Sequence, residues 1–164
     1  MKKYIAVIPA RGGSKRFPGK NIYPLDDKPL LTYSIRYAQS CAGISGVYVS
    51  TDSSEIAQVA IQNQAEVIIR PEKLAGDHVA TADVLQQLAE TLIRKHILFD
   101  YIVLLQPTNP LRPRNMLNEA ICLMEEEKCD SLMTVNPCAR KLGKIEEGKF
   151  IPSNYYYGQR SQDM

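Results

Sequence analysis

No stretch of this 164-residue sequence is apolar for the roughly 20 residues that a membrane-spanning helix needs. The first apolar run, Tyr4–Ile8, is followed at once by Pro9 and Arg11. It is shorter than the core of a secretory signal, which takes about 7–15 residues. We therefore expect a cytoplasmic protein that has no membrane segment.

Side chains that bind metals are few and scattered. The sequence has two histidines and four cysteines, and the cysteines are Cys41, Cys122, Cys129 and Cys138. No two cysteines form a Cys-x-x-Cys pair, and the histidines show no ligand spacing. This distribution favours buried, reduced thiols over a zinc site.

An excess of charge of one sign is also absent. The net charge is +2, with 23% charged and 45% hydrophobic residues, which is ordinary for a globular protein. Such a small net charge does not predict a nucleic-acid partner. The length suits one domain with a sizeable core.

The positive charge is concentrated locally, in the segment Ile8–Asn21. This segment follows the Tyr4–Ile8 run, which is typical of a buried strand. It contains three glycines and four cations but no acid; these are Gly12, Gly13, Gly19, Arg11, Lys15, Arg16 and Lys20. Cations this dense repel one another unless an anion or water separates them, and glycines let backbone N–H groups approach a ligand. The segment therefore favours a polyphosphate ligand, and the alternative is a solvated basic loop.

Two common phosphate loops do not fit this segment. A Walker loop needs a glycine five residues before Gly19, where Ser14 stands, and it needs Ser or Thr where Asn21 stands. The dinucleotide fingerprint Gly-x-Gly-x-x-Gly fails because Gly12 and Gly13 are adjacent.

Apolar periodicity predicts strands that alternate with helices. The predicted strands are Tyr4–Ile8, Val47–Ser50, Val67–Ile69, Tyr101–Leu105 and Ser131–Val135. The predicted helices are Leu30–Ala38, Ile56–Ile61, Thr81–His96 and Met116–Glu127. This order indicates an α/β fold with a Rossmann-like, mostly parallel sheet and helices on both faces. The unbroken run Tyr101–Leu105 predicts a central strand that is buried on both faces.

Three segments carry a resemblance to a known family. Ile8–Ile22 resembles the signature of the acylneuraminate cytidylyltransferases, the CMP-sialic acid synthetase-like family. Arg70–Asp77, with the sequence RPEKLAGD, is similar to that family's Arg-Pro-x-x-Leu-Ala-x-Asp segment. Leu104–Arg112 is similar to its Leu-Leu-Gln-Pro-Thr-Ser-Pro-Leu-Arg segment, with Asn109 in place of the serine.

The resemblance implies a role for each matched residue. Arg11 and Lys20 would be catalytic by neutralising the triphosphate. Nucleotide contacts would come from Ala10, Arg11, Gly12, Gly13, Ser14, Lys15, Lys20, Asn21, Arg70 and Thr81, with Arg70 at the pyrimidine edge. Sugar contacts would come from Gln106, Thr108, Lys141 and Arg160.

Structural alternatives exist for several of these residues. Arg70 could instead form a surface salt bridge, and Thr81 could be a helix N-cap followed by the early acid Asp83. Asp52 is a ribose or metal contact or, as we prefer, a helix cap. Arg112 and the prolines near it favour a rigid structural loop.

The resemblance implies a nucleotidyltransferase that joins CTP to an acidic nine-carbon, sialic-acid-like (nonulosonic) sugar, giving the CMP-sugar and pyrophosphate. Mg²⁺ is the cofactor that the family implies, and a homodimer is a possible assembly. Residues 1–164 would form a single nucleotidyltransferase domain without the family's C-terminal part, which carries the magnesium aspartates. The alternatives are a truncated homologue that binds nucleotide without turnover, or a related nucleotidyltransferase for another acidic sugar.

Overall fold

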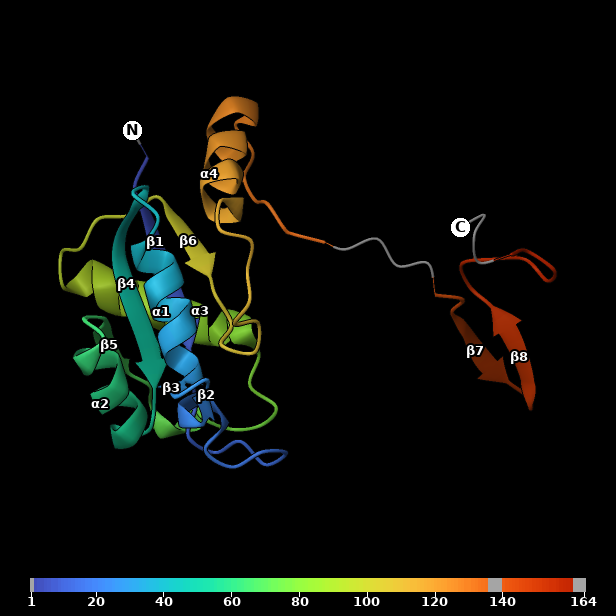
Figure 1. Cartoon of the computed structure of the whole chain (residues 1–164), viewed down its shortest axis with the longest axis horizontal. Helices are drawn as coiled ribbons and strands as arrows, with labels where there is room; N and C mark the ends of the chain where they lie inside the picture. Colours follow the sequence, from blue (N-terminus) through green and yellow to red (C-terminus); the bar gives the residue numbers. More distant parts are fainter. Residues whose placement is uncertain (1, 136–139, 161–164) are drawn as a thin grey trace. The chain divides into compact units, whose positions relative to one another are not determined.

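The computed structural model describes residues 2–135 and 140–160. The chain divides into two compact units, Met1–Lys128 and Cys129–Met164 (Figure 1).

The first unit is built on a parallel four-stranded sheet with the order β5-β4-β1-β6. Its strands are β1 (Tyr4–Pro9), β4 (Ile44–Thr51), β5 (Glu66–Ile69) and β6 (Tyr101–Leu104). Its α-helices are α1 (Leu30–Gln39), α2 (Ser54–Gln62), α3 (Thr81–Arg94) and α4 (Met116–Glu127). Short elements fill the connections: the 3₁₀ helices η1 (Lys20–Ile22) and η2 (Glu72–Leu74), and the hairpin of β2 (Pro24–Leu25) and β3 (Lys28–Pro29).

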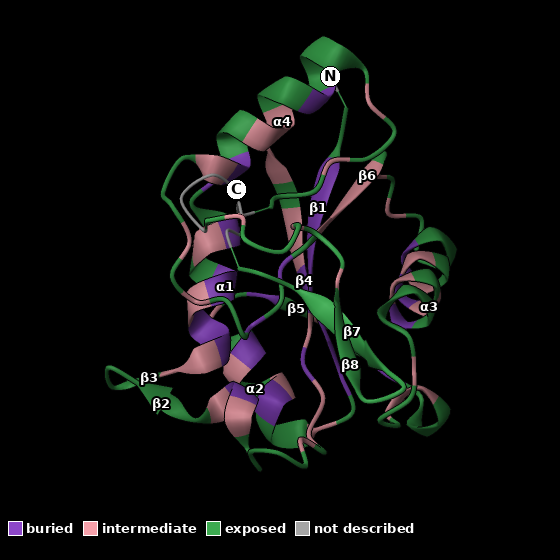
Figure 2. Ribbon diagram, turned by 90° about the vertical axis from the view of Figure 1, so that its right-hand side faces the viewer, coloured by how far each residue is buried: buried purple, intermediate pink, exposed green. Residues whose placement is uncertain are grey.

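Helices cover both faces of this sheet because strand side chains alternate between the faces. On β1, Ala6 and Ile8 pack in the core with residues of α1 and α2, whereas Ile5 and Val7 pack in a second core with Leu88 of α3. Figure 2 shows α1 and α2 on one side of the sheet and α3 on the other, with β1 buried between them. The predicted α/β fold with a parallel sheet and helices on both faces is confirmed.

The order of the strands positions the functional site. From β1 the chain moves outward through β4 and β5 and then returns to the opposite side of β1 to form β6. Ligands of open α/β sheets bind where the order reverses, at the carboxyl ends of the strands. In this unit the reversal lies between β1 and β6, so the segments that follow these two strands border the expected site.

The sequence predictions of the elements were largely correct, with two errors. Within the described sheet β6 is an edge strand that pairs only with β1, and Leu104 is 39% exposed. The apolar run had suggested a central strand because a run alone does not specify how many neighbours pair with it. Ser131–Val135 forms no strand, and Met133 and Val135 are exposed, so this short run lacks both a pairing partner and apolar cover.

The second unit contains the antiparallel hairpin of β7 (Gly143–Glu146) and β8 (Lys149–Pro152), which the sequence reading did not predict. Among the cysteines, Cys41 is buried as expected, Cys122 is exposed, and Cys138 lies outside the described residues. Within the described chain, none of the helices combines the length and apolar character needed to cross a membrane.

Candidate functional site

A pocket of 280 Å³ lies in the first unit at the carboxyl ends of the strands. Its walls come from the segments that follow β1, β5 and β6 and from the start of α3. The residues are Pro9, Arg11, Lys20, Asn21, Arg70, Leu74, Gly76, Asp77, Val79, Thr81, Val84, Gln106, Pro107 and Thr108. Three of them are cations, and the pocket therefore suits an anionic ligand.

The segment after β1 is held in place by the end of β4. The Ala10 N–H donates to the carbonyl of Ser50 at 2.9 Å, and the Gly12 N–H donates to the carboxylate of Asp52, also at 2.9 Å. A Cβ atom on Gly12 would come within 3.0 Å of the Cβ of Ser53, so this close approach favours glycine. Asp52 was predicted as a helix cap, but Ser53 is the N-cap of α2. Asp52 does not cap the helix because its carboxylate accepts the hydrogen bond from the loop instead.

The far end of the same loop is closed by Asn21. Its buried side-chain amide donates to the carbonyl of Arg11 at 3.0 Å. Gly19 precedes Lys20 with φ 68°, a left-handed conformation that glycine adopts without steric cost. These contacts bring Arg11 and Lys20, which are nine positions apart, to the same pocket.

Arg70 lies under the pocket and is only 6% exposed. Its guanidinium donates to the carbonyl of Ser50 at 2.9 Å and to the Ser50 hydroxyl at 3.3 Å. Burial lowers the pKa of Arg70, an effect that the nearby Asp52 opposes and the like charge of Arg11 reinforces. The alternative of a surface salt bridge is therefore wrong, because Arg70 is buried and bonded to the backbone of β4.

The carboxylate of Asp77 bridges two loop cations. Its oxygens lie 2.6 Å from the Arg11 guanidinium and 2.5 Å from the Lys15 ammonium. The Lys15 ammonium and then the Arg11 guanidinium lower the pKa of Asp77 below its ordinary value. Within the described chain no hydrogen bond or ion pair holds the Lys20 ammonium, so it remains available to a ligand.

The segment after β6 is clamped by Arg112. The half-buried guanidinium donates to the carbonyl of Gln106 at 2.7 Å and to the hydroxyl of Ser34, a buried residue of α1, at 3.0 Å. It also lies 5.5 Å from the centre of the Tyr37 ring. This agrees with the rigid loop expected from the sequence, and the clamp places Gln106 and Thr108 on the pocket wall.

The structure brings half of the predicted site residues together in one pocket. Lining the pocket are Arg11, Lys20, Asn21, Arg70, Thr81, Gln106 and Thr108. Thr81 is the first residue of α3 and Ala80 is the N-cap, so the predicted cap at Thr81 is wrong; Asp83 does lie in the first turn. Ala10, Gly12, Gly13, Ser14 and Lys15 belong to the loop without lining the pocket, and the N–H groups of Ala10, Gly12 and Ser14 already donate within the chain. Their nucleotide contacts stay predictions.

The remaining predicted residues, Lys141 and Arg160, belong to the second unit, and their sugar-binding role stays a prediction. The Lys141 ammonium donates to the carbonyl of Gln159 and lies 5.0 Å from the centre of the Tyr155 ring.

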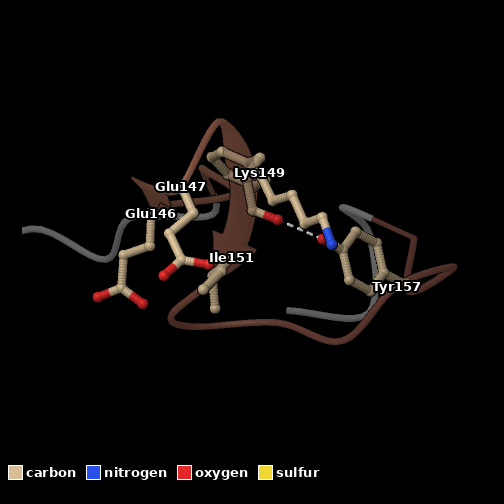
Figure 3. Close-up of a pocket in the computed structure, with 6 residues that line it drawn as sticks. Glu146, Glu147, Lys149, Ile151 and Tyr157 are labelled. Carbon is tan, nitrogen blue, oxygen red and sulfur yellow. Dashed lines mark hydrogen bonds between the residues drawn. The ribbon is translucent and has the colours of Figure 1, made fainter.

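A second pocket, of 630 Å³, lies on the hairpin of the second unit (Figure 3). Glu146, Glu147, Lys149, Ile151 and Tyr157 line it together with Phe150, whose carbonyl accepts a hydrogen bond from the Tyr157 hydroxyl. This pocket contains none of the residues that the sequence motifs singled out. Its two carboxylates make it a poor site for an anion.

Two acids have roles that the sequence did not predict: Asp77 lines the first pocket, and Asp52 supports the loop that borders it. Asp77 was quoted only as a member of a motif, and Asp52 was assigned to a helix. Asp52 follows a strand and Asp77 ends a motif, but the partner of each carboxylate depends on which segments the fold brings close to it. Among the described residues, no group of three or more His, Cys, Asp or Glu could hold a metal ion.

Comparisons with known proteins match most of the chain. Residues 5–149 match the family model described as Cytidylyltransferase. The chain is 38% identical over 143 residues to the CMP-N,N'-diacetyllegionaminic acid synthase of Legionella pneumophila, covering 85% of this chain and 60% of that protein. It is 36% identical to the pseudaminic acid cytidylyltransferase of Campylobacter jejuni, covering 99% of this chain and 72% of that protein.

Solved structures share the fold. The structure of a CMP:2-keto-3-deoxy-manno-octonic acid synthetase in complex with CTP superposes with a TM-score of 0.64 at 26% identity, covering 77% of this chain and 48% of that chain. A 4-diphosphocytidyl-2C-methyl-D-erythritol synthase superposes with a TM-score of 0.70 at 18% identity, which supports the fold alone. The chain thus spans between about half and three quarters of the length of these relatives.

Proposed function

Because the chain belongs to the cytidylyltransferase family, we propose that it transfers the cytidylyl group of CTP to a sialic-acid-like, nonulosonic sugar. The relatives named for legionaminic and pseudaminic acids support this class of acceptor. The observation that carries the proposal is the grouping of Arg11, Lys20 and Arg70 with Gln106 and Thr108 in one pocket of the first unit. These are the residues assigned to phosphate, base and sugar from the sequence motifs.

The proposed reaction is an in-line displacement at phosphorus. The anomeric hydroxyl oxygen of the sugar forms a bond to the α-phosphorus of CTP and loses its proton. The bond between the α-phosphorus and the bridging oxygen breaks, and pyrophosphate leaves with the electron pair. Arg11 and Lys20 stabilise the negative charge that develops on the phosphate oxygens, and this electrostatic effect is commonly the largest part of such catalysis.

Each wall of the pocket has a distinct part in the proposal. Arg70 is held rigidly by Ser50, so its guanidinium can present remaining N–H groups to the carbonyl oxygen and ring nitrogen of cytosine. Gln106 and Thr108 orient the sugar from the β6 side, where the sheet order reverses. In this proposal the triphosphate lies at the end of β1 and the sugar at the end of the neighbouring strand β6.

Magnesium, which the family resemblance implied, has no matching ligand set in the described chain. Asp77 is the only carboxylate that lines the pocket among the described residues, and it is paired with Arg11 and Lys15. Asp52 accepts a backbone hydrogen bond. The proposed mechanism accordingly assigns charge neutralisation to the cations of the loop and contains no metal step. Cytoplasmic location and dimer formation stay predictions.

Release of pyrophosphate from CTP tests the proposal when it is measured with a panel of nonulosonic acids and with Mg²⁺ in the buffer. We expect release that depends on one of these acids and that Lys20→Ala abolishes. Calorimetric CTP binding without release would favour a nucleotide-binding homologue that does not turn over. A preference for ATP or GTP over CTP would contradict both.

A further inference from the structure

Asp77 holds a position that the proposed reaction does not explain. It is the only acid among the described residues that line the pocket, and it pairs with Arg11 and Lys15 through different oxygens. Its carboxylate is 25% exposed, whereas the Lys15 side chain is 82% exposed. The ion pair therefore lies at the edge of the pocket, where an incoming anion would meet the same two cations.

The segment that carries Asp77 is weakly anchored. Asp77 lies between η2 and α3, outside regular secondary structure. The two hydrogen bonds that flank it are long: the Arg11 guanidinium donates to the carbonyl of Ala75 at 3.4 Å, and the Val79 N–H donates to the carbonyl of Gly76 at 3.4 Å. Bonds of this length are near the limit of useful geometry, so withdrawal of the segment breaks little else.

We propose that Asp77 is a built-in competitor for phosphate, which occupies Arg11 and Lys15 until a polyphosphate displaces it. This inference rests on the proposed function, since it deepens the role of the same pocket. Arg11 and Lys20 line the same pocket, and Lys15 shares the Asp77 carboxylate with Arg11. The linked oxygens of a triphosphate can therefore replace the carboxylate at Arg11 and contact Lys20 at the same time, which releases Asp77 from Lys15 as well. Asp77 thereby favours an anion with several linked oxygens over an anion that could replace it at one cation alone.

The alternative is that Asp77 preorganises the two cations and stays paired with them when phosphate binds. The two roles predict opposite effects of removing its charge. A competitor lowers phosphate affinity, so Asp77→Asn would tighten binding. A preorganising residue raises phosphate affinity, so the same variant would weaken binding.

The experiment is calorimetric titration of the chain with inorganic triphosphate and with cytidine, at low ionic strength and without metal. Asp77→Asn is compared with the wild type, with Asp77→Glu, which keeps the charge, and with Asp27→Asn. Asp27 is exposed in the β2–β3 turn and does not line the pocket, so this control changes the net charge equally. In Asp77→Asn the triphosphate no longer has to break two partly exposed ion pairs. We therefore expect the variant to bind triphosphate roughly 3- to 10-fold more tightly than the wild type. Cytidine binding should not change, and Asp27→Asn and Asp77→Glu should bind triphosphate like the wild type.

Unchanged or weaker triphosphate binding by Asp77→Asn would overturn the inference while leaving the proposed function intact. An equal gain in Asp27→Asn would also overturn it, because the effect would then be one of net charge. If neither the wild type nor Asp77→Asn bound triphosphate, the phosphate role of the pocket would fail, and both proposals with it. Tighter triphosphate binding without pyrophosphate release from CTP would support the role of Asp77 and contradict catalysis.

Discussion

The Gly12 N–H donates a 2.9 Å hydrogen bond to the carboxylate of Asp52, and this contact joins the loop after β1 to the end of β4. Gly12 lies next to Arg11, so the bond fixes the backbone that presents a pocket cation. The loop is thus held by side-chain and backbone contacts at its first residues and by Asn21 at its end.

Replacing Asp52 tests this support. Asp52→Ala removes the acceptor, whereas Asp52→Asn removes the charge and keeps an oxygen that can accept. We expect Asp52→Ala to bind CTP about 3- to 10-fold more weakly than Asp52→Asn, since a hydrogen bond contributes about 1 kcal/mol. Hydrogen exchange of the Gly12 amide should be faster in Asp52→Ala alone. Equal CTP affinity of the two variants would show that the acceptor oxygen of Asp52 does not support the loop.

Gly19 should tolerate a side chain less well than Gly13. Gly19 has φ 68°, and a left-handed conformation costs an L-residue about 1–2 kcal/mol. Gly13 has open space where a Cβ would lie and no positive φ, so Gly13→Ala is the control. Urea unfolding should give a lower free energy of unfolding for Gly19→Ala than for Gly13→Ala. CTP affinity should fall in the same variant, because Gly19 precedes Lys20; similar behaviour of the two alanines would refute the prediction.

Arg112 should stabilise the loop that follows β6. Arg112→Ala leaves the carbonyl of Gln106 and the hydroxyl of Ser34 without this donor, so we expect a loss of about 1–3 kcal/mol in the free energy of unfolding. Arg114→Ala, at an exposed arginine two residues away, should change it by less than about 0.5 kcal/mol. Chemical denaturation of both variants measures the difference, and comparable losses would show that the clamp contributes nothing specific.

The raised pKa of Tyr4 predicts that the protein loses stability in alkaline solution. Its hydroxyl donates to Glu125 at 2.8 Å, and burial followed by this bond raises the pKa of Tyr4 from 10.0 to about 12. The native state keeps the proton in this range while the unfolded chain loses it, so the stabilisation is complete below pH 10 and falls as pH rises toward 12. Unfolding midpoints between pH 9 and 12 should fall less steeply in Tyr4→Phe than in the wild type. If the midpoints of the two proteins fell in parallel, the titration of Tyr4 would not contribute to the loss of stability.

Sequence reasoning identified the loop cations and the alternation of strands with helices because both depend on local patterns. The run before Pro9 and the helical spacing from Thr81 specify elements whatever their neighbours are. Which strand lies at an edge depends on pairing between distant segments, and so β6 was misplaced. The partners of Asp52 and Asp77 depend in the same way on contacts between loops that lie 40 and more residues apart.

Motif resemblance assigned Arg70 to the ligand but could not show how the residue is held. Its burial and its two bonds to Ser50 arise from the pairing of β4 with β5. Arg70→Lys tests base recognition better than Arg70→Ala, because lysine keeps the positive charge and lacks only the fork of N–H donors. We therefore expect Arg70→Lys to discriminate less well between CTP and UTP.

A crystal structure of the chain with CTP would show whether the pocket of the first unit binds the nucleotide. We expect the triphosphate against Arg11 and Lys20, the cytosine edge against Arg70, and the Asp77 carboxylate released from Arg11 and Lys15. A nucleotide bound elsewhere, or an empty pocket at saturating CTP, would contradict it.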